Sequence, residues 1–457
     1  MDKLIRVRKL AIPAGVIAAV CVGALAAGSV QADSRHEDAH RLDDEGGSTP
    51  VARSGSPLAA RRALAQGQLR ARLESELRRV GGQSGAWVYD IRGRGPRLLY
   101  SDHGRDARVL ASNTKLFTTA AYLEALGPEG RLRTRIWARG TREGPDERVL
   151  KGSLALVGAG DPALASPSFA ANHHLPLTRL KPLARAVRRA GIRRVEGVIR
   201  ADDTVFDRRR GVPQTGVGFE PTLGPLSGLS YDSGMDAGHF ASDPARVAGE
   251  ALERTLRKLG VRVTQGVEVG GTGPSLQERA PLAALRSPTA ARLLAETNKE
   301  SNNFFAETML KRLAASGAHR GTTARGARKV ERLADRWGSG VRLENGSGLS
   351  RRDRASPRQV GQLLVHLAGD GKLAKPFRAS LAIAGRDGTL ENRMRGTAAE
   401  GRCQAKTGTI NFVSALSGYC KSRSGLVAFS LLMNSVDVGA AQRAQDAMAS
   451  AIARYGR

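Results

Sequence analysis

The sequence predicts an α+β protein whose main domain is interrupted by a large β-rich insertion. Leucines at helical spacing over 58–80 indicate an amphipathic helix, which two glycines separate from a strand over 86–89. A second helix is expected over 111–126, and the chain ends with a predicted hairpin and a helix over 440–455. From about 137 to 242 the pattern changes, because short β-like runs alternate there with glycine and proline turns.

The chain of 457 residues is longer than one hydrophobic core usually organises, which favours several structural units. Apolar residues make up 41% and charged residues 25% of the chain, so a folded globular protein is expected. The expected units are a signal peptide, a flexible polar lead, the first part of the main domain, the inserted domain or domains, and the second part of the main domain. Their bounds are, in that order, 1–32, 33–57, 58–136, 137–242 and 243–457.

The N-terminus has the pattern of a secretory signal. Basic residues precede a small apolar stretch over 10–30, and Val30-Gln31-Ala32 is a small-residue cleavage site. A transmembrane anchor would need a more apolar run of about 20 residues. Cys21 lies inside the apolar stretch and follows a valine where a lipoprotein would need a small residue, so lipidation is not expected. The chain is therefore predicted to reach the cell-wall or periplasmic space, and whether the signal is cleaved or anchors the protein stays open.

The formal net charge of +29 is spread along the whole chain. Such a charge attracts polyanions without specifying which one. The basic residues form no concentrated run, and neither a C2H2 spacing nor an RNP-like aromatic pattern accompanies them, so nucleic acid is not expected as a partner. Anionic cell-wall polymers fit an exported chain better, although a solvated basic surface explains the charge as well.

Removal of the signal leaves two cysteines, Cys403 and Cys420, and an even number in an exported chain permits one disulfide. The stretches 401–409 and 413–420 are typical of strands with a short turn between them. If the hairpin is centred between residues 411 and 412, the two cysteines lie directly opposite each other, within disulfide reach. A disulfide that closes the hairpin is therefore favoured over two free thiols.

The helix predicted over 111–126 carries Ser112 and Lys115 near its start. A spacing of three places the hydroxyl and the amine on one face of a helix, one turn apart. Serine is a poor nucleophile at neutral pH and needs a base, and a lysine can serve when burial and nearby positive charge keep its amine neutral. On its own this pattern is also typical of a solvated lysine on any helix.

Two further polar elements follow far along the chain, one opening a predicted helix and one on the first strand of the predicted hairpin. They are Ser301-Asn302-Asn303 and Lys406-Thr407-Gly408-Thr409. The first supplies a hydroxyl and an amide. In the second, strand alternation sends Lys406 to the face opposite Cys403. Gly408 leaves room for a substrate backbone, and the two threonine hydroxyls can bind a carboxylate.

In this order the three elements resemble the active-site signature of penicillin-binding proteins and serine β-lactamases. The long gap between Ser112 and Ser301 resembles the low-mass class C penicillin-binding proteins, the D-Ala-D-Ala carboxypeptidases and endopeptidases whose catalytic domain is interrupted by extra domains. The likeness covers roughly residues 60–457. Further stretches similar to this family are Gly158–Pro162, Asn298–Asn303, Gly346–Arg351 and Asp387–Leu390.

The resemblance implies a transpeptidase-like fold, an antiparallel sheet flanked by helices, with the insertion between the first and second motifs. It also implies a serine-type D-Ala-D-Ala carboxypeptidase that acts on peptidoglycan stem peptides and is acylated by β-lactams. Neither a cofactor nor a metal is expected. Carboxypeptidase and endopeptidase action differ mainly in the leaving group, so the sequence leaves both open.

The same resemblance implies a role for each motif. Ser112 would attack the carbonyl between the two D-alanines, with Lys115 as general base. Ser301 would relay the proton to the leaving D-alanine, and Asn303 would hold Lys115 and the substrate amide.

Lys406 would lower the pKa of the catalytic lysine and attract the terminal carboxylate, which Thr407 and Thr409 would bind. The backbone N–H groups of Ser112 and Thr409 would form the oxyanion hole.

Two alternatives share these motifs. A β-lactamase-like hydrolase is disfavoured because the chain has no E-x-x-L-N segment of the class A kind and because the long insertion has no place in those enzymes. A non-catalytic wall-binding or penicillin-sensing protein is disfavoured because Ser112, Lys115 and the other motif residues are intact. A literal H-E-x-x-H occurs over 36–40, but its polar surroundings offer no apolar face that could bury a zinc site.

Overall fold

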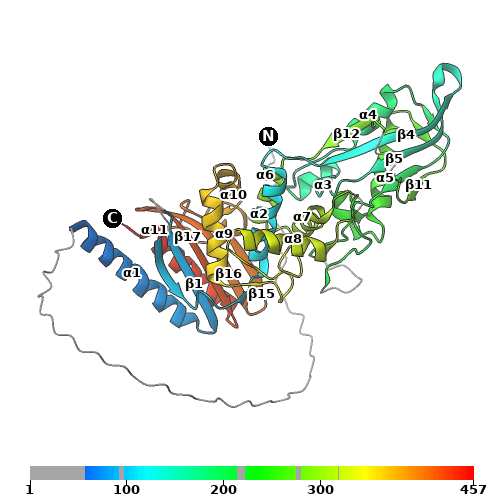
Figure 1. Ribbon diagram of the computed structural model, residues 1–457. Coiled ribbons are helices and arrows are strands. Elements are labelled where there is room, and N and C mark those ends of the chain that lie inside the picture. The colour runs from blue at the N-terminus through cyan, green and yellow to red at the C-terminus, as the bar shows by residue number, and fades with distance from the viewer. Residues whose placement is uncertain (1–56, 92–96, 214–221, 274–278, 318, 457) are drawn as a thin grey trace, which may run out of the picture. The chain divides into compact units, whose positions relative to one another are not determined.

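The computed structural model describes residues 57–91, 97–213, 222–273, 279–317 and 319–456 (Figure 1). The predicted signal peptide, most of the polar lead and the H-E-x-x-H stretch lie outside these residues. Helices occur along the whole described part of the chain. They are α1 Pro57–Val80, α2 Thr114–Leu126, α3 Pro167–Asn172, α4 Lys181–Arg189, α5 Pro244–Lys258, α6 Ala290–Lys299, α7 Asn303–Ala314, α8 Thr323–Arg336, α9 Pro357–Gly369, α10 Ala374–Ala379 and α11 Val438–Arg454.

The central layer of the main domain is an antiparallel sheet that joins both ends of the described chain. Its strands are, in spatial order, β14 Ala382–Ile383, β15 Cys403–Ile410, β16 Val413–Ser422, β17 Gly425–Asn434, β1 Gln83–Asp90 and β2 Arg97–Asp102. Each strand runs antiparallel to its neighbours. Because β1 pairs along its whole length with β17, the segment before the insertion and the end of the chain form one sheet (Figure 1).

Helices cover both faces of this sheet, as the alternation along β16 requires. Leu416 and Cys420 point to a core that includes α1 and α11. Ala415 and Tyr419 point to the opposite core, which includes α2 and the helices α6 to α10. Burial of apolar side chains on both faces explains why β17 is a nearly continuous apolar run. The prediction of an antiparallel sheet flanked by helices is confirmed.

A second sheet, mixed in direction, forms the insertion. Its strands are β10 Arg262–Val263, β6 Arg194–Val195, β5 Val149–Val157, β4 Arg133–Glu143 and β12 Ala283–Arg286, with β7 Ile199–Asp202 between β5 and β11 Val267–Val269. The strand β4 runs antiparallel to β5 and β12, whereas β6 and β7 run parallel to β5. The helices α4 and α5 pack on this sheet around a core of its own (Figure 1).

The second sheet extends past the bounds that the sequence predicted for the insertion. It runs from Arg133 to Arg286, whereas the predicted bounds were 137–242. The reason lies in α5, whose buried Ala248 and Leu252 belong to the core of the second sheet. A helical pattern that returns after residue 243 does not itself reveal which sheet the helix packs against.

Two short pairings hold the segments around the sheets together. The strand β3 (Arg108–Val109) pairs with β13 (Arg354–Ala355), and β8 (Met235–Asp236) pairs with β9 (His239–Phe240). The first pairing matters for the site, because it fixes the chain just before Ser112 against the chain just after the Gly346–Arg351 stretch.

The hairpin of β15 and β16 has the predicted register. Cys403 lies opposite Cys420, and the tight turn passes through Asn411 and Phe412. The Sγ atoms of the two cysteines are 2.01 Å apart. Among the helices that the structure describes, none is both long and apolar enough to cross a membrane.

Candidate active site

The backbone just before α2 is sharply turned at Ser112. The predicted single helix over 111–126 is in fact a short 3-10 helix, Ala111–Asn113, followed by α2. Ala111 has a positive φ of 45°, which is costly for a residue with a side chain. Gly348 lies so close that a Cβ added to it would be 1.8 Å from the Ala111 carbonyl oxygen. Only glycine allows the 346–351 loop to press against the serine in this way.

Lys115 is fully buried beside Ser112 and forms three hydrogen bonds. Its Nζ lies 3.0 Å from Ser112 Oγ, 2.7 Å from Asn303 Oδ1 and 2.7 Å from the carbonyl oxygen of Ser347. These acceptors come from three separate segments, and none of them carries a charge. The amine is thus held one hydrogen bond away from the serine hydroxyl, at the distance that proton transfer requires.

Burial lowers the pKa of Lys115 from its usual 10.5 to about 7, because an ammonium loses its hydration inside the protein. The carboxylates of Glu307 and Asp353 act in the opposite direction and raise the pKa of Lys115. At neutral pH a large share of the Lys115 amine is therefore unprotonated and able to accept a proton.

The second motif lies where α6 ends and α7 begins, and each of its three residues has a different structural role. Ser301 has a positive φ of 59° in the turn between α6 and α7, and it is not among the hydrogen-bond acceptors of Lys115. Asn302 caps α7, since its Oδ1 accepts a hydrogen bond from the Phe305 backbone N–H at 3.1 Å. Asn303 begins α7 and contacts Lys115 directly. The structure therefore brings Asn303, but not the Ser301 hydroxyl, into contact with the lysine.

The third motif lies against the start of α2. Asn113 Nδ2 donates a hydrogen bond of 3.1 Å to the Lys406 carbonyl oxygen. A Cβ added to Gly408 would lie 2.9 Å from the Leu110 carbonyl oxygen and 3.1 Å from the Ser112 backbone nitrogen. Glycine at this position thus lets the serine-bearing segment approach β15, which is a reason that the sequence did not reveal.

Lys406 is also fully buried, and its Nζ donates to the Thr407 carbonyl oxygen at 2.9 Å. Burial lowers the pKa of Lys406 well below its usual value, and the positive charge of Lys115 lowers it further. The sequence led us to expect the repulsion to act on Lys115. Burial is the largest cause of the lowered pKa of Lys115, and the repulsion, which is mutual for two ammonium groups, adds to the lowering of the pKa of Lys406.

The two threonines of this motif lie on the strand face opposite Lys406. Thr407 is buried and its Oγ1 donates to Thr389 Oγ1 at 2.8 Å, whereas Thr409 is exposed. The neighbouring strand β14 pairs only with Gln404 and Ala405. In the described sheet, the part of β15 from Lys406 onward therefore has no strand paired to it on this side, although the Thr407 carbonyl oxygen already accepts from Lys406 Nζ.

Several residues of the site were missed by reasoning on the motifs alone. They are Thr222, Glu307, Ser347, Asp353 and Thr389. Ser347 and Thr389 fall within stretches that had been recognised as family-like, so a signal for them existed. Glu307 lies one helical turn after Asn303, and that spacing is the only sequence hint for it. Thr222 belongs to the insertion, and its Oγ1 accepts a hydrogen bond of 3.2 Å from Asn303 Nδ2.

Comparisons with known proteins show which family this chain belongs to. A profile of the D-Ala-D-Ala carboxypeptidase 3 (S13) family matches residues 65–217 and 232–455. The D-alanyl-D-alanine carboxypeptidase of Actinomadura sp. is 32% identical over 439 residues, which cover 78% of this chain and 79% of that protein. A carboxypeptidase of Mycobacterium tuberculosis is 27% identical over 366 residues, with coverage of 75% and 74%.

A solved structure supports the fold as well. Penicillin binding protein 4 from Haemophilus influenzae superimposes with a TM-score of 0.67 at 20% identity, covering 82% of this chain and 97% of that one. The fold is that of the penicillin-binding proteins, and in it Ser112 lies beside the buried Lys115. More narrowly, the chain belongs to the D-Ala-D-Ala carboxypeptidase 3 (S13) family, and the prediction of a serine-type carboxypeptidase is confirmed.

Proposed function

We propose that this carboxypeptidase cleaves the terminal D-Ala-D-Ala bond of peptidoglycan stem peptides through an acyl-enzyme formed on Ser112. The observation that carries the proposal is the 3.0 Å distance between Ser112 Oγ and the buried Nζ of Lys115. A base at hydrogen-bond distance with a pKa near neutrality is what turns a serine hydroxyl into a nucleophile. Membership of the family supplies the substrate class.

The reaction proceeds in two stages. Ser112 Oγ attacks the carbonyl carbon between the two D-alanines while its proton passes to the Lys115 amine. The carbon–nitrogen bond then breaks, the nitrogen of the last D-alanine takes up the proton, and free D-alanine leaves. The shortened stem peptide stays behind as an ester of Ser112, which water hydrolyses with Lys115 again taking the proton.

Asn303 fits the positioning role, since its Oδ1 already holds Lys115. Its Nδ2 points to Thr222 and would bind the substrate amide in exchange. Ser301 is proposed as the proton relay to the leaving nitrogen on the strength of the family likeness, because its hydroxyl does not contact Lys115.

Lys406 and the strand edge fit the binding of the substrate backbone. An extended peptide can add to the unpaired part of β15 through main-chain hydrogen bonds. The terminal carboxylate would be attracted by Lys406 and bound by Thr407 and Thr409, with Thr407 exchanging its present partner Thr389 for the carboxylate. The backbone N–H groups of Ser112 and Thr409 would then stabilise the oxyanion.

The cellular setting is part of the same proposal. Family members act on the cell wall, which gives this chain an extracytoplasmic role. We expect residues 1–32 to direct export, and the facing thiols of Cys403 and Cys420 to form a disulfide in the oxidising compartment. The net charge of +29 suits attraction to anionic wall polymers. The inserted domain is proposed to span 133–286.

The test is covalent labelling of the purified protein with a fluorescent penicillin, followed by peptide mass analysis of the adduct. We expect one adduct on Ser112 and none in Ser112→Ala. Release of D-alanine from a pentapeptide ending in D-Ala-D-Ala should disappear in the same variant. Cys403→Ser serves as a control that leaves the serine and the lysine in place. An adduct on another residue, or labelling that survives Ser112→Ala, would falsify the assignment.

A further inference from the structure

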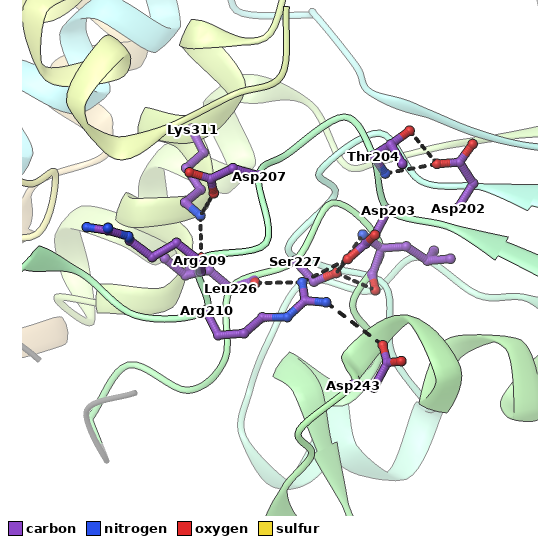
Figure 2. Close-up of polar contacts among 11 residues, drawn as sticks. Asp202, Asp203, Thr204, Asp207, Arg209, Arg210, Leu226, Ser227, Asp243 and Lys311 are labelled. Carbon is purple, nitrogen blue, oxygen red and sulfur yellow. Dashed lines mark hydrogen bonds and ion pairs between the residues drawn. The ribbon is translucent and has the colours of Figure 1, made fainter. Parts of the chain in front are cut away.

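The helix α7 carries three polar residues at four-residue spacing, Asn303, Glu307 and Lys311, which places them on one face. Each contacts a different part of the molecule. Asn303 holds Lys115, Glu307 holds the loop that contains Ser347, and Lys311 holds the insertion. Figure 2 shows the last of these contacts, in which Lys311 Nζ reaches Asp207 and the Arg209 carbonyl oxygen, each at 2.6 Å.

The carboxylate of Glu307 fixes the backbone that faces the catalytic lysine. Its Oε1 accepts hydrogen bonds from the backbone N–H groups of Gly346 at 2.8 Å and Ser347 at 2.7 Å. The carbonyl oxygen of the same Ser347 accepts the hydrogen bond from Lys115 Nζ. On the other side, the Gly346 carbonyl oxygen accepts from Thr118 Oγ1 of α2 at 2.9 Å. Ser347 thus connects the two side chains: its backbone N–H binds Glu307, and its carbonyl oxygen binds Lys115.

A charged residue is costly in this place, since Glu307 has no exposed surface. Burying a carboxylate is unfavourable unless hydrogen bonds or opposite charges compensate for the lost hydration. The two amides could be satisfied by the neutral oxygen of a glutamine as well. The negative charge therefore calls for a separate reason, and Lys115 is a positive group that gains from it, as does Lys311 on the same helix as Glu307.

We propose that Glu307 is a positioning residue for the acylation reaction, which holds the Gly346–Ser347 peptide against Lys115 and stabilises the ammonium that forms when Lys115 takes the serine proton. The inference rests on the proposed role of Lys115 as the base. Glu307 does not touch the substrate or the reacting atoms. It acts through the Ser347 carbonyl and through its charge.

The charges around this pair come from several elements. Lys115 on α2 is influenced by Glu307 on α7 and by Asp353 in the turn before β13, both of which raise its pKa. Glu307 itself has a pKa raised by burial, which its backbone hydrogen bonds and the charge of Lys115 oppose. Lys311 on the same helix is influenced by Glu307, and Lys406 on β15 by Lys115. Of these groups, Glu307 alone combines charge with a hydrogen-bonded connection to the acceptor of Lys115.

The test is the pH dependence of penicillin acylation in Glu307→Gln, measured on the full chain. Glutamine keeps an oxygen for the two amides but removes the charge, so the pKa of Lys115 should fall. We expect the acid limb of the acylation profile to move to lower pH by on the order of one pH unit, with a lower plateau rate. Asp161→Asn is the matched control. Asp161 is also a buried carboxylate bound by a backbone N–H and a hydroxyl, but it is not among the groups that shift the pKa of Lys115.

A lower plateau with an unmoved acid limb would mean that Glu307 is only structural, and would overturn the proposal. A limb that moves in Asp161→Asn would overturn it as well. If Glu307→Gln does not fold, Glu307→Asp keeps the charge and withdraws it from the two amides, so its limb should stay at the wild-type pH while the plateau falls; a limb that moves contradicts the proposal. Failure of the proposed function is distinguishable, because the wild-type protein would then show no Ser112 adduct at all.

Discussion

Two buried lysines, both without exposed surface, lie in different settings in this molecule. Lys115, at the active site, donates to a hydroxyl, an amide oxygen and a backbone carbonyl, all of them uncharged. Lys311, at the junction with the insertion, donates to the carboxylate of Asp207 and to a backbone carbonyl (Figure 2). The two side chains thus have the same burial and different partners.

The hydrogen-bond partners of a buried lysine affect its pKa and therefore the role that it can have. Burial lowers the pKa of both side chains, but at Lys311 the directly bound carboxylate of Asp207 opposes the shift, which keeps the ammonium favourable. At Lys115 the carboxylates act without a hydrogen bond to the amine, and its pKa falls to about 7. Lys311 is thereby suited to joining α7 to the insertion, and Lys115 to accepting a proton.

Removal of each lysine in turn should separate their roles most clearly in the rate of acylation. We expect Lys115→Met to lower the rate of labelling by a fluorescent penicillin by roughly a thousandfold or more, because Ser112 loses its base. The matched variant Lys311→Met removes an equally buried lysine from the same core and should keep the rate within about tenfold of wild type. Similar losses in both variants would contradict the distinction between a base and a structural cation.

The role of Lys115 should also be visible in the pH dependence of acylation. As the proposed base, Lys115 would act only in its neutral form, so acylation should rise with pH up to about 7 and level off above it, falling about tenfold per pH unit on the acid side. Burial favours the neutral amine and lowers the pKa of Lys115 from 10.5, so the acid limb of the acylation profile lies at a lower pH than for an exposed lysine. The measurement is the acylation rate from pH 5 to 9 at constant ionic strength. A limb that stays near the value of an exposed lysine would show that another group acts as the base.

Part of this arrangement could be predicted from the sequence, because some of its contacts join residues that are close along the chain. The hairpin register follows from strand alternation around one turn, so the facing positions of Cys403 and Cys420 could be predicted. The pairing of Ser112 with Lys115 follows from one turn of helix. Both depend on residues that are near each other along the chain.

The remaining features depend on long-range packing, which no short pattern encodes. Lys115 binds Ser347 through a main-chain carbonyl, and any residue type could supply that oxygen. Gly408 is required by the approach of Ser112, which only the folded chain reveals. The packing of α5 on the second sheet could not be predicted for the same reason, since its helical pattern does not say which core it joins.

Replacement of Lys311 is expected to have the smallest effect on catalysis but a clear effect on stability. Lys311→Met should lower the free energy of unfolding by about 2–3 kcal/mol, because Asp207 keeps its charge and loses the ammonium that compensated for its partial burial. Urea unfolding measures the change.

The double variant Lys311→Met with Asp207→Leu removes both partners together and should recover part of the loss, since no uncompensated charge is left at the junction. Lys115→Met offers the reverse pattern, because the lost partners there are neutral and no charge is left without its partner; it should lower the unfolding free energy less than Lys311→Met does, while acylation is lost. If instead Lys115→Met destabilised the protein as much as Lys311→Met, the uncharged acceptors around Lys115 would be holding a full ammonium, and the contrast between the two lysines would disappear.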